Sequence, residues 1–172
     1  MARMTLSKKD RDLWHRDEET WWNKYGEYMT YQWRLTPGMN RIIRTGLDRD
    51  YKKFLTHPGE QILDLGCGSG WLSFYFAENN MDVLGVDISK EQIDSAIKQQ
   101  KKEKVKNIRF ECHDFISWNC GRYKEKFENI FVNAFLHHLP EDELEVLIEK
   151  ISLILKPGGN VYMYEPCRSS RG

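Results

Sequence analysis

A glycine-rich segment, ILDLGCGSG, occupies residues 62–70 and begins with a short apolar run. Glycines at alternate positions allow a tight turn in which the backbone approaches a ligand without a Cβ clash. The apolar run predicts a strand over residues 61–65, and the residues after the glycines predict a helix over 71–79. A strand, a glycine turn and a helix in this order favour an α/β fold.

The same alternation continues along the chain. Strands are predicted over residues 82–86, 108–111, 128–133 and 160–165, helices over 90–104 and 141–155, and a turn over 156–159. This rhythm predicts a doubly wound, mostly parallel, Rossmann-like sheet with helices on both faces. Right-handed crossovers bring the carboxyl ends of the strands to one rim, where ligands bind.

The N-terminal region is rich in aromatic residues and reads as helical. Tryptophans and tyrosines spaced by three, four and seven residues predict an amphipathic helix, Pro37-Gly38 interrupts it, and a second helix is predicted over residues 39–55. We expect residues 1–56 to form a helical cap or lid, and residues 57–172 to form the ligand-binding domain. Tyr25, Tyr28 and Tyr31 are candidate ligand contacts, because aromatic rings exclude water and attract cations. Simple packing of the helices on the sheet is the alternative.

Composition excludes several classes of protein. Lysine plus arginine equals aspartate plus glutamate, 26 against 26, so the chain has no excess positive charge to favour a nucleic-acid partner. No apolar run approaches the about 20 residues that a membrane span needs, and the N-terminus does not resemble a secretory signal. The four cysteines lack zinc-ligand spacing, so we predict no metal site and a reducing, cytoplasmic location.

The glycine turn is a poor site for a dinucleotide. Gly66, Gly68 and Gly70 take relative positions one, three and five, whereas the dinucleotide fingerprint needs a glycine at position six, which is Trp71. Asp64 would also repel a pyrophosphate. An NAD-dependent oxidoreductase is therefore the disfavoured alternative. A ligand with an ammonium and a sulfonium but no phosphate fits Asp64 better, and S-adenosylmethionine has these features.

Two further acidic residues follow predicted strands. Asp87 lies at the end of the second strand, where an acidic side chain accepts the hydroxyls of a ribose. Its alternative role is that of a helix N-cap, since Ser89 and Glu91 follow. Asp114, after the third strand, can accept from an adenine amino group, with Phe115 covering the ring. A loop acid beside a core aromatic residue is the alternative for that pair.

Five segments, ILDLGCGSG, GVDIS, HDF, NAFLHHLP and LKPGG, together resemble the class I S-adenosylmethionine-dependent methyltransferases over about residues 58–166. The resemblance implies a seven-stranded sheet of order 3-2-1-4-5-7-6 with an antiparallel strand 7. It implies that the glycine turn holds the methionine part of the cofactor and that Asn133 faces the methyl-transfer point. The cofactor-binding residues that we expect are Asp64, Gly66, Cys67, Gly68, Gly70, Asp87, Ile88, Asp114, Phe115 and Asn133.

The resemblance implies methyl transfer from S-adenosylmethionine to a small-molecule acceptor. His137 and His138 are candidate general bases, with polar rim residues as the alternative. The chain closes with CRSSRG soon after the fifth predicted strand, without the family's last two strands. We therefore expect a fragment, or a second copy or partner chain that covers the edge of strand five. A catalytically inactive cofactor-binding module that acts through a partner is the alternative function.

Overall fold

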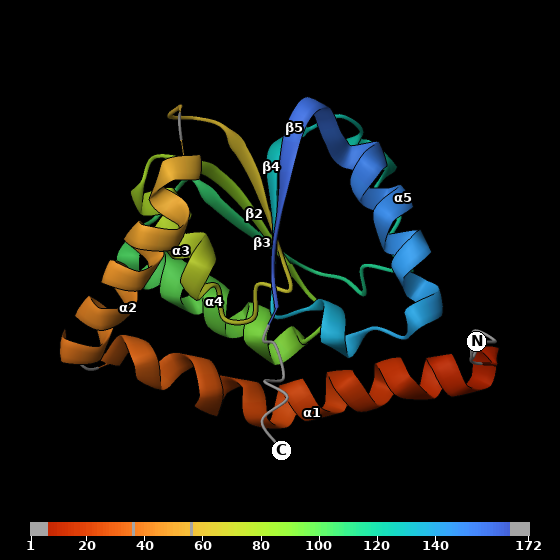
Figure 1. Ribbon diagram of the computed structural model, residues 1–172. Coiled ribbons are helices and arrows are strands. Elements are labelled where there is room, and N and C mark those ends of the chain that lie inside the picture. Colours follow the sequence, from red (N-terminus) through yellow and green to blue (C-terminus); the bar gives the residue numbers. More distant parts are fainter. Residues whose placement is uncertain (1–6, 36, 56, 166–172) are drawn as a thin grey trace, which may run out of the picture.

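Five parallel strands form one sheet in the computed structural model, which describes residues 7–35, 37–55 and 57–165. The strand order is β3-β2-β1-β4-β5, and every neighbouring pair is parallel (Figure 1). The bounds are β1 Gln61–Leu65, β2 Asp82–Asp87, β3 Ile108–Cys112, β4 Phe127–Asn133 and β5 Leu155–Tyr164. The predicted doubly wound fold is confirmed, and the order agrees with the first five strands that the resemblance implies.

Helices cover both faces of the sheet (Figure 1). On one face lie α2 (Pro37–Tyr51) and α3 (Trp71–Glu78), and their apolar side chains form one core cluster with Ile62 and Phe131 of the sheet. On the other face lies α5 (Leu144–Ile154), which packs in a second cluster. Apolar residues on both sides of the strands explain this arrangement, because a parallel sheet buries both its faces.

The long helix α1 (Lys8–Leu35) lies across the carboxyl ends of the strands (Figure 1). It meets α4 (Lys90–Glu103) through a hydrogen bond of 2.6 Å from the Ser89 hydroxyl to Asn23 Oδ1. The second N-terminal helix, α2, packs more deeply, since its Leu47 is buried in the core. The division into a cap of residues 1–56 and a domain of residues 57–172 stays a prediction. Among the described residues, no helix is both long and apolar enough to cross a bilayer.

Several element boundaries differ from the sequence expectation, and two of the differences have a clear structural reason. The predicted helix over residues 141–155 starts with a 3₁₀ turn, Glu141–Glu143, and only then becomes α5. The predicted turn over 156–159 lies within the bounds of β5, where the register with β4 shifts: Phe127 pairs with Leu155, and Asn129 pairs with Asn160. The extra residues of β5 form an irregular bulge, because Pro157 lacks an N–H donor and cannot continue the ladder.

Candidate functional site

The glycine turn leaves β1 and is anchored to the neighbouring strand. The backbone N–H groups of Gly66 and Cys67 both donate to the carbonyl of Val86 in β2, at 2.9 and 3.1 Å. Gly66 has φ 72°, in the left-handed region, and a Cβ added there would lie 2.8 Å from the Phe135 ring. Gly68 and Gly70 also have positive φ, 53° and 83°. A side chain is thus disfavoured at these three positions, where the backbone is open to close approach by a ligand.

Asp64 lies in β1 directly below this turn. Its side chain is 1% exposed, and its carboxylate accepts a hydrogen bond of 2.5 Å from the Ser73 hydroxyl of α3. Burial raises the pKa of Asp64 to about 7, although the bond from Ser73 opposes this shift. A buried carboxylate is stabilised by a nearby cation, so the turn favours a positively charged ligand over a phosphate.

Asp87 closes β2 and fastens two segments together. Its Oδ2 accepts from the N–H of Gly68 at 2.8 Å and its Oδ1 from the N–H of Ser89 at 2.9 Å. Each carboxylate oxygen keeps a second lone pair that can accept a ribose hydroxyl. The N-cap of α4 is Ser89, so the alternative of Asp87 as that cap is wrong. Ile88 lies between Asp87 and Ser89 in the sequence.

Cys67 lies within the turn and is buried. Burial raises the pKa of its thiol, so the thiol stays protonated and is a weak nucleophile. A Cβ added at Gly85 of β2 would lie 2.9 Å from its Sγ. The side chain therefore fills space beneath the turn, and the contact of Cys67 with the cofactor stays a prediction.

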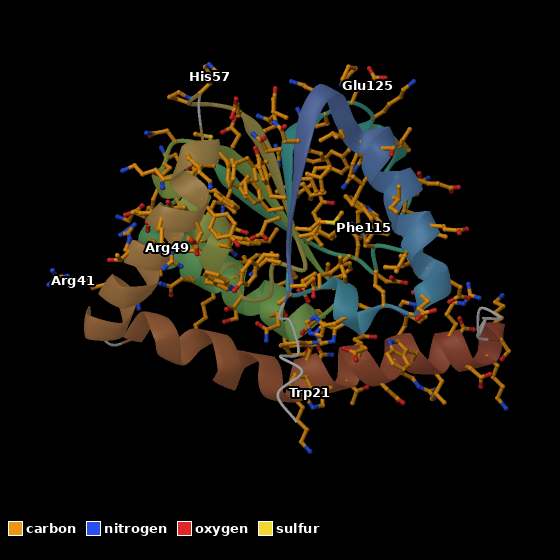
Figure 2. The ribbon with its side chains drawn as sticks, viewed as in Figure 1. Trp21, Arg41, Arg49, His57, Phe115 and Glu125 are labelled. Carbon is orange, nitrogen blue, oxygen red and sulfur yellow. The ribbon has the colours of Figure 1, made fainter. Side chains whose placement is uncertain are left out.

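Asp114 and Phe115 follow β3, but they face different surroundings. Asp114 Oδ1 accepts from the N–H of Ile116 at 3.0 Å and lies 3.8 Å from His15 Nδ1 of α1. The ring of Phe115 is 3% exposed and lies between the sheet and α5, with its centroid 5.8 Å from that of Trp118 (Figure 2). The loop acid is therefore near the rim and the aromatic ring is in the core. Their contact with adenine stays a prediction.

A cavity of about 410 Å³ adjoins Asp114 at the end of β3. His113 stacks on Trp118 at its wall, with ring centroids 4.9 Å apart. The lining residues are His113, Asp114, Ser117, Trp118, Asn119 and Arg122. The cavity shows that Asp114 borders space at the carboxyl edge of the sheet.

Asn133 closes β4 and has a partner that the sequence analysis missed. The Tyr51 hydroxyl of α2 donates to Asn133 Oδ1 at 3.2 Å. Burial, together with the nearby Asp64 carboxylate, raises the pKa of Tyr51 to about 12. Tyr51, Asn133 and Asp64 are therefore neighbours at the end of the central strands.

His137 and His138 follow β4 in a 3₁₀ turn, Leu136–His138. Glu165, after β5, holds His137: its Oε2 lies 2.7 Å from His137 Nδ1, and its Oε1 accepts the N–H groups of Phe135 and Leu136, both at 2.8 Å. With the proton on Nδ1, Nε2 of His137 keeps its lone pair. Glu165 was missed, although a residue after a predicted parallel strand could have been placed on this rim.

His138 faces α1 and not Glu165. Its Nδ1 lies 2.9 Å from Glu18 Oε2, and its carbonyl accepts from the Trp14 indole at 2.8 Å. Burial lowers the pKa of His138 and outweighs the opposing effect of Glu18. The N-terminal candidates were Tyr25, Tyr28 and Tyr31, and their side chains lie outside the described residues.

The comparisons with known proteins agree with this geometry. A family described as a methyltransferase domain matches residues 62–159, more than half of the chain. The chain belongs to the S-adenosylmethionine-dependent methyltransferase family. The match runs from β1 through the glycine turn, Asp87 and Asn133 into the bulge of β5.

Two named relatives are methyltransferases, and a solved structure shares the fold. A ubiquinone biosynthesis O-methyltransferase of Coxiella burnetii is 28% identical over 144 residues, 84% of this chain and 56% of the relative. Phosphoethanolamine N-methyltransferase 1 of Triticum aestivum is 32% identical over 120 residues, 68% of this chain and 23% of the relative. The structure of Haemonchus contortus phosphoethanolamine N-methyltransferase 1, in complex with phosphoethanolamine and S-adenosylhomocysteine, shares the fold with a TM-score of 0.73 and 17% identity, over 96% of this chain and 34% of that one. The chain thus spans about half, or less, of the length of these relatives.

Proposed function

We propose that the protein transfers a methyl group from S-adenosylmethionine to a small-molecule acceptor. The observation that carries the proposal is a pair of carboxylates around a glycine turn that disfavours phosphate: Asp64, which is buried, and Asp87, which is partly buried and accepts the N–H of Gly68. The family supports it, and the relatives named above include an O-methyltransferase and an N-methyltransferase with small acceptors.

Residues of the turn and the strand ends would hold the cofactor. The Gly66–Gly70 backbone takes the methionine part, with Asp64 favouring its ammonium, Asp87 and Ile88 take the ribose side, and Asp114 takes the adenine amino group. S-adenosylmethionine supplies an electrophilic methyl carbon, whose bond to sulfur breaks as the acceptor's lone pair forms a new bond to carbon. Positioning and exclusion of water are then the protein's main tasks.

His137 is the general base that we favour for an acceptor that loses a proton. Its Nδ1 is 2.7 Å from Glu165, so the carboxylate can fix the tautomer that leaves Nε2 free to accept the proton. The lowered pKa of His138 keeps that ring neutral near pH 7, which makes it the second candidate. An acceptor amine that reacts as a free base would need neither.

The surroundings of the site support three further proposals. We infer that residues 1–56 act as a lid, since α1 lies across the carboxyl ends of the strands. We infer that a second copy or a partner segment covers β5, whose described pairing is with β4 alone and whose Tyr164 side chain is 62% exposed. The described cysteines are free thiols, which supports a cytoplasmic location.

Calorimetry tests the proposed cofactor directly. The protein is titrated with S-adenosylmethionine, with S-adenosylhomocysteine and, as a control, with NADH. We expect binding of the first two and none of NADH, followed by methylated product with acceptors drawn from phenols and amines. Absence of binding to both adenosyl ligands would refute the proposal. Binding without product across the acceptors would favour the inactive module that acts through a partner.

A further inference from the structure

Tyr51 stands where α2 meets the face of the sheet that carries Asp64. Asp64 of β1 pairs in register with Phe131 of β4, and side chains two residues apart on a strand share a face. Asn133 therefore lies on the same face as Phe131 and Asp64. The Tyr51 ring packs on this face, with its centroid 5.7 Å from that of Phe131 and 6.2 Å from that of Phe76. Packing fixes the ring, so it also fixes where the hydroxyl lies.

The hydroxyl group is a dedicated donor. It lies 3.2 Å from Asn133 Oδ1. The pKa of Tyr51 is raised to about 12, so the group stays protonated at any physiological pH. When Oδ1 accepts this proton, the amide nitrogen of Asn133 is on the opposite side and keeps two N–H donors.

We propose that Tyr51 is a positioning residue for methyl transfer, which orients the Asn133 amide so that its N–H groups face the cofactor. The inference rests on the proposed function, because it assumes that a cofactor lies at the carboxyl ends of β1 and β4. Without the hydroxyl, the amide turns freely and can present its oxygen instead. The bound ligand would then meet an acceptor in place of a donor, and affinity would fall.

Tyr51→Phe removes the hydroxyl and leaves the ring in the core. Tyr75→Phe is the matched control, because the Tyr75 hydroxyl also joins α3 to α2 but donates to Asp48 Oδ1, at 2.9 Å, and not to Asn133. Calorimetry with S-adenosylhomocysteine should show affinity about 5-fold weaker for Tyr51→Phe, the size expected for one hydrogen bond. The control should stay within about 2-fold of the wild type.

A double-mutant cycle separates positioning from general support of the fold. Asn133→Ala should weaken binding by about as much as Tyr51→Phe, and the double variant should be no weaker than Asn133→Ala alone, because Tyr51 acts through Asn133. Additive losses would overturn the inference. So would wild-type affinity in Tyr51→Phe.

The side-chain amide resonances of Asn133 give a readout that needs no ligand. In ¹⁵N-labelled protein they should move in Tyr51→Phe and stay in place in Tyr75→Phe. Unchanged Asn133 resonances in Tyr51→Phe would overturn the inference even if the wild type binds cofactor. If the wild type binds no adenosyl ligand, the proposed function fails, and the placing of Asn133 at a cofactor fails with it.

Discussion

The site has two halves that are built in different ways. Around the glycine turn, the contacts involve backbone groups. Asp87 accepts from the N–H groups of Gly68 and Ser89, and the turn donates hydrogen bonds to the carbonyl of Val86. Where α1 crosses the rim, the contacts are between side chains. Arg11 pairs with Asp142 at 2.7 Å, and His15 with Glu143 at 2.8 Å, between residues more than 120 positions apart.

This difference separates a fixed half from a movable one. A carboxylate that accepts two backbone N–H groups cannot leave without breaking the turn itself. Ion pairs between side chains can break and re-form when a helix moves, even where one partner is buried, as Glu143 is. The cofactor half should therefore be formed before any ligand arrives, while the α1 half should be able to open.

The strongest test of the fixed half is Asp87→Ala. The change leaves the N–H groups of Gly68 and Ser89 without their acceptor and removes the expected ribose contact. We expect cofactor affinity to fall roughly 100-fold, or about 2.7 kcal/mol, in calorimetry. Asp87→Asn, which keeps one oxygen acceptor, should lose less. An affinity within a factor of three of the wild type in Asp87→Ala would contradict the assignment.

Asp64→Asn tests the buried charge, and its effects on binding and stability should have opposite signs. The pKa of Asp64 is about 7 in the folded protein against an ordinary 3.8. Between these values the folded state binds more protons, so the stabilising contribution is fully present below about pH 4 and is lost as the pH rises past about 7. The asparagine side chain of the variant cannot ionise and can still accept from Ser73.

We therefore expect the free energy of unfolding of Asp64→Asn, measured with urea, to exceed that of the wild type at pH 8 by on the order of 1–3 kcal/mol. At pH 5 the difference should be smaller. Its affinity for the cationic cofactor should fall by about 10-fold at pH 8, because one attractive charge is gone. Wild-type affinity should itself rise from pH 6 to pH 8. A variant that is less stable at pH 8 would show that the buried charge is not the cause.

The same contrast explains what the sequence could predict. The strands and the glycine turn follow from local periodicity and from glycine spacing. Asp87 was located from its position at the end of the second predicted strand, since the ends of neighbouring parallel strands must meet on one rim. These features depend on contacts that the fold class already implies.

Other features depend on side chains that only the tertiary structure brings together. No local pattern links Tyr51 with Asn133, which lie 82 positions apart, or selects Ser73 as the residue that covers Asp64. Pro157-Gly158 reads as a turn, yet β5 continues through it because pairing with β4 resumes at Asn160. Phe115 shows why position in the sequence alone does not assign a ligand contact. The adjacent Asp114 borders the rim, while the ring of Phe115 lies in the core.

Glu143→Gln tests the movable half, with the smallest of the three effects. The Glu143 side chain is wholly buried and faces both His15 Nε2, at 2.8 Å, and Arg11 Nε, at 3.8 Å. Glutamine keeps the shape and one hydrogen bond but loses the charge, so α1 should detach more often, by about 1 kcal/mol. Amide hydrogen exchange should speed up about 5-fold in the first half of α1 and stay unchanged in β1.

Asp94→Asn is the control, since it breaks the exposed pair of Lys90 and Asp94 on α4. Its effect on exchange in α1 should be undetectable, because such surface pairs contribute little. If Glu143→Gln left exchange in α1 unchanged, the charges would not hold the helix, and packing of its aromatic side chains would have to do so. If exchange rose equally in β1, the two halves would open together, and the distinction between a fixed half and a movable half would be lost.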